Sequence, residues 1–262
     1  MIDLHTHLIP GVDDGARDLA EAVEMCRLAA SDGCRTLIAT PHLRQSAFWN
    51  ADRADLERRF AELRNLVGDL VDLRLGGEIH AHDGVFAELD ALPDGDLLPL
   101  AGTRSLLLEL DFRGVRGVHP MDLVHETTVA GWRPILAHPE RLRWLMDDLD
   151  LIESLVAAGC RLQITAMSLT GALGPIPREA CLRLLRRGLV HFVASDMHGV
   201  SLRPPGLSKA RSELARLVGE AAAQRIMEEN PQRVLADEPV APTVPSEPSS
   251  GRRGLLGLGA RS

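Results

Sequence analysis

The stretch IDLHTH, residues 2–7, decides the fold, because it joins a short apolar run to two histidines that are one residue apart. If this run is a β-strand, side chains two positions apart point to the same face, so His5 and His7 lie together where the strand ends. Two imidazoles on one face at a strand end indicate a metal site. The residues that follow, LIPGVDDG (8–15), add acidic neighbours, among them Asp14.

Strand-like and helix-like segments alternate along the rest of the chain. Amphipathic stretches with apolar residues at helical spacing lie between most of the apolar runs. The runs predict strands at residues 2–7, 36–42, 73–79, 105–110, 134–138, 161–165 and 190–196. Repeated βα units with nearly continuous apolar strands favour a parallel sheet. The expected fold class is therefore α/β, a distorted TIM-like (β/α)7 barrel.

Histidines and carboxylates recur at the carboxyl ends of these expected strands. In a parallel barrel those ends meet on one face, where the active sites of this architecture lie. The residues are His5, His7, His42, Glu78, Glu109, His138, Asp196 and His198. Imidazole and carboxylate without thiolate suit catalytic Mn, Fe or Zn. We expect His80 and His82 to line the cleft without binding metal, and His119, His125 and His191 to be ordinary surface or core histidines.

The composition bounds the function and the location. Among 262 residues, 37 acidic side chains outnumber 29 basic ones and give a formal net charge of -8, which argues against a nucleic-acid-binding surface. The four cysteines show no paired spacing, which is typical of reduced thiols in the cytoplasm. No run fits a signal peptide or a membrane span. We therefore expect a cytoplasmic protein that does not insert into a membrane.

The composition changes near residue 236. The segment ADEPVAPTVPSEPSSGRRGLLGLGARS is rich in Pro, Ser and Gly and has no aromatic residue. Such a segment buries too little apolar surface to offset its ordering entropy. The expected organisation is one barrel domain over residues 1–235, followed by a disordered tail over residues 236–262.

The motifs resemble those of the polymerase and histidinol phosphatase (PHP) superfamily, and within it the bacterial CpsB/CapC-type protein-tyrosine phosphatases of capsule and exopolysaccharide systems. The phrases that carry the resemblance are MIDLHTHLIPGVDDG, TPH, GGEI, LLLEL, AHPER and VASDMHGVSLRPP, which span residues 1 to about 205. The sequence departs from this pattern at Ile79 and His80, where relatives often have an aromatic pair, and in having no tyrosine.

The resemblance implies a role for each matching residue. His5, His7, Glu78 and Asp196 would bind a first metal ion, and Glu78 would bridge to a second ion held by Glu109 and His138. Asp14, His42 and His198 would bind a third ion.

Arg141 and Arg203 would contact the phosphate, and Asp14 is also a candidate acid. The cofactor would be two or three divalent ions, Mn foremost, with Fe or Zn as alternatives. The partner would be a phosphotyrosine protein, namely a tyrosine kinase of polysaccharide export, and a homo-oligomer stays open.

The chemistry of the residues agrees with this resemblance. Clustered cations lower the pKa of a bridging water, supply hydroxide at neutral pH and hold the phosphate oxygens during in-line attack. A tyrosine phenol has a pKa near roughly 10, so it leaves without strong acid assistance. The expected function is thus hydrolysis of phosphotyrosine.

Other functions stay open at this point. A PHP enzyme for a small-molecule phosphate and a carboxylate-bridged amidohydrolase need the same ligands, although the lysine-bridged amidohydrolases are excluded because the single lysine, Lys209, falls outside every expected strand. Cys181 and Arg187 have the spacing of a cysteine phosphatase, but the residues between them are bulky and belong to an expected helix. A metal-stabilised scaffold is disfavoured because structural sites are usually closed and rich in thiolate.

Overall fold

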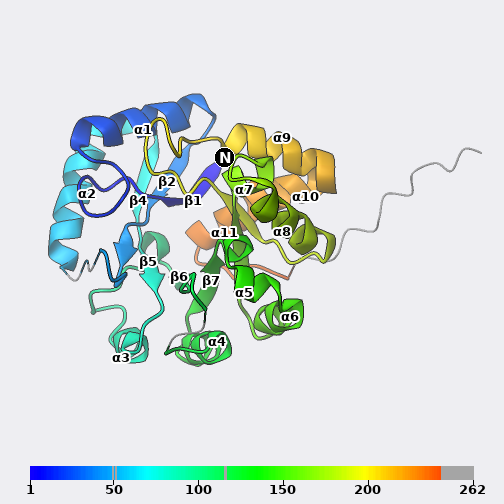
Figure 1. Cartoon of the computed structure of the whole chain (residues 1–262). Coiled ribbons are helices and arrows are strands. Elements are labelled where there is room, and N and C mark those ends of the chain that lie inside the picture. Colours follow the sequence, from blue (N-terminus) through cyan, green and yellow to red (C-terminus); the bar gives the residue numbers. More distant parts are fainter. Residues whose placement is uncertain (49, 51, 115–116, 243–262) are drawn as a thin grey trace, which may run out of the picture.

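The computed structural model describes residues 1–48, 50, 52–114 and 117–242 (Figure 1). Its strands are β1 (Ile2–Thr6), β2 (Thr36–Ala39), β3 (His42–Leu43), β4 (Asp72–Leu75), β5 (Glu78–His80), β6 (Ser105–Glu109), β7 (Arg133–Ala137), β8 (Arg161–Thr165) and β9 (Phe192–Ala194). Its α-helices are α1 (Leu19–Ser31), α2 (Arg53–Val67), α3 (Val85–Asp90), α4 (Pro120–Val129), α5 (Arg143–Met146), α6 (Leu149–Ala157), α7 (Ala166–Thr170), α8 (Pro175–Arg186), α9 (Leu207–Val218), α10 (Glu220–Gln224) and α11 (Asn230–Leu235). Short 3-10 turns are η1 (Gly68–Leu70), η2 (Leu100–Gly102) and η3 (Pro139–Arg141), and η4 (Arg225–Glu229) is a π-helical turn.

The strands form a barrel in which every strand pair is parallel. One sheet has the order β1-β2-β4 and the other has the order β3-β5-β6-β7-β8-β9. The chain runs from β2 into β3 and from β4 into β5, so each of these pairs is one interrupted strand whose first half lies in one sheet and whose second half lies in the other. The barrel closes where Thr6 pairs with Met197 and the backbone N–H of Asp196 donates to the carbonyl of His5 at 3.0 Å. The expected (β/α)7 barrel is confirmed.

Two of the expected strands are interrupted. The expected strand 36–42 divides into β2 and β3 at Thr40 and Pro41, because proline has no N–H for a strand ladder. The expected strand 73–79 divides into β4 and β5 at Gly76 and Gly77. A Cβ atom at Gly77 would lie 2.3 Å from Cδ1 of Leu43, so the Leu43 side chain packs directly on the Gly77 backbone and leaves no room for a side chain there. Expecting continuous strands was therefore wrong at these two points.

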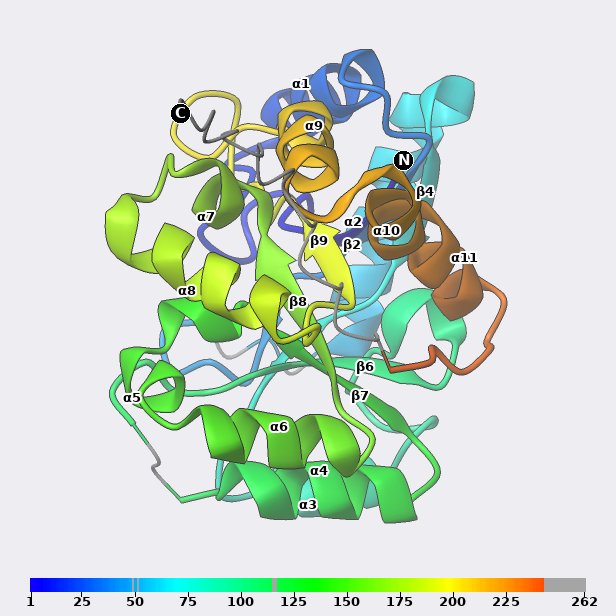
Figure 2. The same cartoon turned by 90° about the vertical axis from the view of Figure 1, so that its right-hand side faces the viewer.

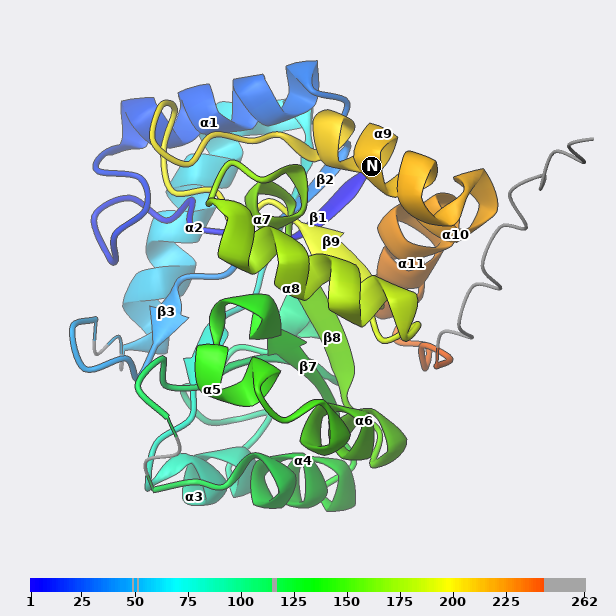
Figure 3. The same cartoon turned by 45° about the vertical axis from the view of Figure 1, so that its right-hand side comes forward.

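Helices surround the strands and bury the outer face of the barrel (Figures 1 and 3). In Figure 2, α3 and α4 lie side by side at one end of the molecule, and α9 and α10 lie at the other. The main core fills the space between helices and strands, with α1 contributing Met25 and α8 contributing Leu184. A separate cluster that includes Leu4, Leu107 and Phe192 fills part of the barrel. No helix within the described residues is long and apolar enough to cross a membrane.

The chain beyond α11 packs on the amino-terminal end of the barrel. The carboxylate of Asp237 accepts a hydrogen bond from the backbone N–H of Arg104 at 2.8 Å and pairs with Arg133 at 2.8 Å. Val240 is buried, and its carbonyl accepts from Nε of Arg161 at 2.7 Å. The expectation that disorder begins at residue 236 was therefore wrong for residues 237–240. These polar contacts and one buried apolar side chain hold them against the barrel. Residues 243–262 of the expected tail lie outside the described residues.

Candidate metal centre

The carboxyl ends of the strands bring the expected site residues together. β1 carries His5, His7 follows the strand directly, and the loop after His7 carries Asp14. The other strands contribute His42 from β3, Glu78 from β5, Glu109 from β6, His138 directly after β7, and Asp196 and His198 after β9. All of these side chains are buried or nearly so except Asp14, which is half-exposed at the mouth of the cluster. We call these nine residues the strand-end cluster.

Glu78 lies at the centre of the strand-end cluster. Its Oε1 is 2.8 Å from Nε2 of His138. Its Oε2 is 2.9 Å from Nδ1 of His42, 3.3 Å from Nε2 of His5 and 3.4 Å from Nε2 of His7. Among the described residues this buried Oε2 nevertheless has no partner with hydrogen-bond geometry. An oxygen surrounded by imidazole nitrogens in this way fits a position shared with a cation.

The tautomers of His5 and His7 follow from their outer hydrogen bonds. Nδ1 of His5 lies 2.9 Å from the side-chain oxygen of Gln163, and Nδ1 of His7 lies 2.8 Å from the carboxylate of Asp13. Both Nδ1 atoms therefore donate, which leaves the Nε2 lone pairs facing inward. These Nε2 atoms are only 3.1 Å apart, an arrangement that a bound metal ion would stabilise.

Sequence reasoning missed Asp13 and Gln163. Asp13 also accepts hydrogen bonds from the backbone N–H of His42 at 3.1 Å and of Gly15 at 3.0 Å, so one carboxylate joins the two histidine-bearing strands. Gln163 offered a signal, since it is a polar residue inside the otherwise apolar strand RLQIT. For Asp13 the sequence offered no signal apart from its position next to Asp14.

Three groups of side chains within the strand-end cluster have ligand atoms close enough to hold an ion. They are His5, His7 and Asp196; His42, Glu78 and Glu109; and His7, Asp14, His42 and His198. His138 adjoins the second group, with Nε2 lying 3.8 Å from Glu109. These groups overlap the expected ligand sets but differ from them in three ways. Glu78 is not grouped with His5 and Asp196, His138 belongs to none of the groups, and His7 and His42 each belong to two.

Electrostatics hold the buried carboxylates of Glu78 and Asp196 ionised. Burial raises the pKa of a carboxyl, but His5 and His42 hold the pKa of Glu78 well below its usual range, and His5 does the same for Asp196. Burial lowers the pKa of His42, yet Glu78 and Asp14 raise it to about 10. Positive charge at this centre is therefore strongly favoured, whether it comes from protons or from cations.

Two arginines meet at Asp196. Its Oδ2 pairs with the guanidinium of Arg203 and with that of Arg141, the latter at 3.0 Å, while Oδ1 faces His5 at 3.4 Å. Arg203 also lies 3.0 Å from Nε2 of His198. Asp196 has a backbone φ of 54° and His138 one of 35°, both in the left-handed region that disfavours side chains. Such strain is concentrated at functional sites.

The remaining histidines and the cysteine motif lie elsewhere or bind other groups. Nδ1 of His80 lies 3.2 Å from Glu109 and Nε2 of His82 lies 3.2 Å from Glu88, and neither belongs to the three ligand groups. His119 accepts a hydrogen bond at the start of α4, His125 is exposed and His191 is buried in the core, as expected. Cys181 faces the core from within α8, and burial raises the pKa of its thiol, which excludes a cysteine nucleophile there.

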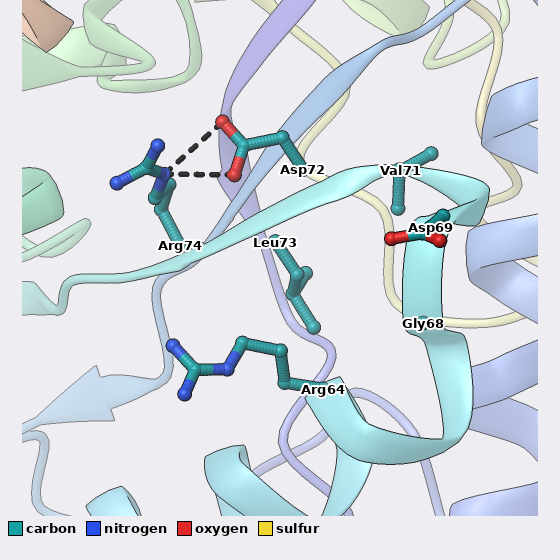
Figure 4. Close-up of a pocket in the computed structure, with 7 residues that line it drawn as sticks. All are labelled: Arg64, Gly68, Asp69, Val71, Asp72, Leu73 and Arg74. Atoms are coloured by element: carbon teal, nitrogen blue, oxygen red, sulfur yellow. Dashed lines mark hydrogen bonds and ion pairs between the residues drawn. The ribbon is translucent and has the colours of Figure 1, made fainter.

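A separate hollow of about 480 Å³ opens at the beginning of β4 (Figure 4). It is lined by Arg64, Gly68, Asp69, Val71, Asp72, Leu73 and Arg74. Arg74 pairs with Asp72 at 2.9 Å, and both side chains are about half-exposed. Because this hollow lies at the amino-terminal end of the strand, it is separate from the strand-end cluster.

Comparison with known proteins identifies the family. The family described as "Capsular polysaccharide synthesis, CpsB/CapC" matches residues 1–236. The chain belongs to the CpsB/CapC family. The match covers the whole barrel, so the resemblance carried by the strand-end motifs is confirmed for the family.

Curated relatives and a solved structure place the chain within the CpsB/CapC family. The tyrosine-protein phosphatase YwqE of Bacillus subtilis is 37% identical over 205 residues, which is 78% of this chain and 79% of YwqE. The putative tyrosine-protein phosphatase CapC of Staphylococcus aureus is 31% identical over 78% of this chain and 79% of CapC. A crystal structure from work on YwqE and on CpsB of Streptococcus pneumoniae, described as unique metal-dependent tyrosine phosphatases, superposes with a TM-score of 0.85 at 32% identity, covering 95% of this chain and 100% of that chain.

Proposed function

We propose that the protein is a metal-dependent protein-tyrosine phosphatase of the CpsB/CapC family. The observation that carries the proposal is the Glu78 carboxylate, which is surrounded by four histidines at the carboxyl ends of the strands. One of these, His5, also faces Asp196, which pairs with both arginines. The tyrosine phosphatase names and the 0.85 TM-score of the family structure support it.

The donor set fits divalent ions that accept nitrogen and oxygen ligands. His5, His7, Glu78 and Asp196 would hold one ion, Glu78, Glu109 and His138 a second, and Asp14, His42 and His198 a third. The chemistry of the ligands suits Mn foremost, with Fe or Zn as alternatives, because no thiolate is present. When bound, such ions supply a nucleophile from water at neutral pH and neutralise charge on the phosphate.

The side chains of this protein perform the remaining steps. Arg141 and Arg203 would turn from Asp196 towards a bound phosphate, whose oxygens accept paired hydrogen bonds from planar guanidinium groups. Asp13 and Gln163 hold the proton of the neutral His7 and His5 rings on Nδ1, so that each Nε2 faces the metal position. Burial raises the pKa of Asp14, but His198 and His42 pull it well below the usual range, which favours Asp14 as a ligand over Asp14 as an acid.

The partner is a phosphotyrosine protein, and we propose a tyrosine kinase of polysaccharide export in the cytoplasm. Two other activities need the same ligands: hydrolysis of a small-molecule phosphate, and amide hydrolysis at a carboxylate-bridged centre. The arginine pair favours a phosphate ester over an amide, because a neutral amide has no oxyanion for a guanidinium to bind before reaction.

The arginine pair gives the test of this function. Arg141→Ala and Arg203→Ala should each lower kcat/KM for a phosphotyrosine peptide by about 1.5 to 3 kcal/mol of transition-state stabilisation, while metal content stays the same. Arg58→Ala, on the exposed face of α2, is the matched control. Unchanged kinetics in both site variants would mean that neither arginine contacts the phosphate.

A further inference from the structure

Two phenylalanines lie against histidines of the strand-end cluster. The ring of Phe112 stacks on that of His138, with centroids 5.7 Å apart and planes 17° apart. The ring of Phe48 stacks on that of His42, with centroids 5.8 Å apart and planes 7° apart. The chain has five phenylalanines and no tyrosine, so two of its few aromatic rings contact this one site.

The side chain of Phe112 is partly exposed beside Arg141. It follows β6, and 44% of the side chain is accessible, although the guanidinium of Arg141 lies 5.1 Å from its ring centroid. The ring thus contacts both His138 and Arg141 and keeps an accessible face beside them. Arg141 is one of the two arginines proposed to hold the phosphate, so Phe112 lies where the rest of the ester would extend.

Phe48 lies at the other side of Glu78. Its backbone N–H donates to the carbonyl of Gln45 at 2.9 Å, which closes a tight turn directly after β3 and holds the half-buried ring over His42. His42 approaches Oε2 of Glu78 and His138 approaches Oε1. The two rings are therefore linked to opposite oxygens of the central carboxylate.

We propose that Phe112 and Phe48 are specificity-determining residues that contact the aromatic ring of the substrate, so that the site binds aryl phosphates in preference to alkyl phosphates. This inference rests on the proposed phosphatase function. Aromatic pairs prefer offset-stacked or edge-to-face contact, and each such contact strengthens binding by about threefold to tenfold beyond simple burial.

The test compares two non-hydrolysable anions that share the phosphonate group. Binding of phenylphosphonate and of methylphosphonate to the Mn-loaded full chain is measured by calorimetry for the wild type, Phe112→Leu, Phe48→Leu and Phe112→Trp. Phe60→Leu is the matched control, because this phenylalanine lies in α2 near Arg64 and away from the cluster. Turnover of p-nitrophenyl phosphate and of acetyl phosphate, which has an acidic leaving group without a ring, gives a second readout.

We expect the wild type to prefer phenylphosphonate and each leucine variant to lose about threefold to tenfold of that preference. Phe112→Trp and Phe60→Leu should keep it, and p-nitrophenyl phosphate turnover should fall more than acetyl phosphate turnover. Equal loss of both phosphonates in Phe112→Leu would overturn the inference, because Phe112 would then act only by positioning Arg141. If the wild type bound the two anions equally, only the inference about the phenylalanines would be overturned. If it bound neither anion and had no turnover, the proposed phosphatase function would be overturned as well.

Discussion

Gly15 shows how closely a single residue constrains the metal centre. A Cβ atom at this position would lie 2.2 Å from the carbonyl oxygen of His7 and 2.4 Å from its Cβ. The loop folds back here because the neighbouring Ala16 N–H donates to that same carbonyl at 3.0 Å, while Asp13 bonds the His7 ring. We predict that Gly15→Ala displaces the loop, lowers Mn affinity about tenfold to a hundredfold, as loss of outer-shell support does, and reduces turnover in parallel.

Calorimetric titration with Mn checks this prediction. Gly206→Ala is the matched control, because a Cβ there meets no atom within 4 Å and the backbone φ of -173° is extended. Wild-type Mn affinity in Gly15→Ala would show that the loop does not need to approach His7 so closely.

His191 gives a second prediction at the residue scale, this time on stability. Burial, reinforced by Arg161, lowers the pKa of His191 to about 3, and its Nδ1 accepts from the backbone N–H of Leu162 at 3.1 Å. The unfolded chain binds a proton at this residue near pH 6.5, so between these two values the unfolded state holds more protons and unfolding becomes easier as the pH falls. His191→Asn keeps an acceptor at the δ position and removes the titration.

Urea unfolding at pH 7 and pH 4.5 measures the effect. The wild type should lose about 2 to 3 kcal/mol more unfolding free energy over this interval than His191→Asn. His125→Asn, at an exposed position, should behave as the wild type. Equal pH dependence in wild type and His191→Asn would mean that His191 is not held neutral by burial.

The residues of the strand-end cluster were predictable because strand periodicity and barrel topology together determine where strand ends lie. His5, His42, Glu78 and His138 all follow apolar runs, and parallel closure brings such positions to one face. Asp13 and Gln163 were not predictable as partners of His7 and His5. Their hydrogen bonds depend on how a loop folds and on how β8 is placed relative to β1 with β9 between them, and neither is encoded by a local pattern.

At the scale of elements, most strand bounds agree with the apolar runs to within a residue or two, and β8 (Arg161–Thr165) agrees fully. The exceptions have local causes. Pro41 interrupts one strand, and Gly76 and Gly77 interrupt another where the Leu43 side chain packs on the Gly77 backbone. Strand β9 is limited to Phe192–Ala194. Helix α8 (Pro175–Arg186) contains Cys181 and the residues after it, as expected, so no loop is available there to wrap a phosphate.

The segment after α11 gives a prediction at this scale. A chain truncated after residue 235 loses the Asp237 ion pairs and the burial of Val240, whereas one truncated after residue 242 keeps both. Burying a valine stabilises by about 1.5 to 3 kcal/mol and exposed ion pairs add about 0 to 1 kcal/mol. The longer form should therefore be more stable by about 2 to 4 kcal/mol in urea unfolding.

Measuring the activity of both truncated forms shows whether residues 237–240 matter only for stability. The two truncated forms should have the same kcat at a temperature where both are folded, because residues 237–240 contact the amino-terminal end of the barrel, away from the strand-end cluster. Val240→Ala in the full chain should reproduce part of the lost stability. If the two truncated forms were equally stable, the domain would end at residue 235, as expected from the sequence.

At the scale of the whole molecule, an acidic protein presents a phosphate-binding site by concentrating its positive charge. The net charge is -8, yet Arg141 and Arg203 meet at Asp196 and the buried cluster draws protons or cations to Glu78. The barrel makes this arrangement possible, because it places side chains from distant parts of the chain on one rigid face.

The measurement that tests the metal mechanism most directly is hydrolysis of a phosphotyrosine peptide before and after metal removal. We predict that the purified protein loses this activity to a chelator and regains it with Mn, that His138→Ala and Asp196→Ala each abolish most turnover, and that Cys181→Ser keeps the wild-type rate. Activity that survives the chelator and disappears in Cys181→Ser would contradict the account. So would a metal-loaded, folded protein that hydrolyses no phosphoester.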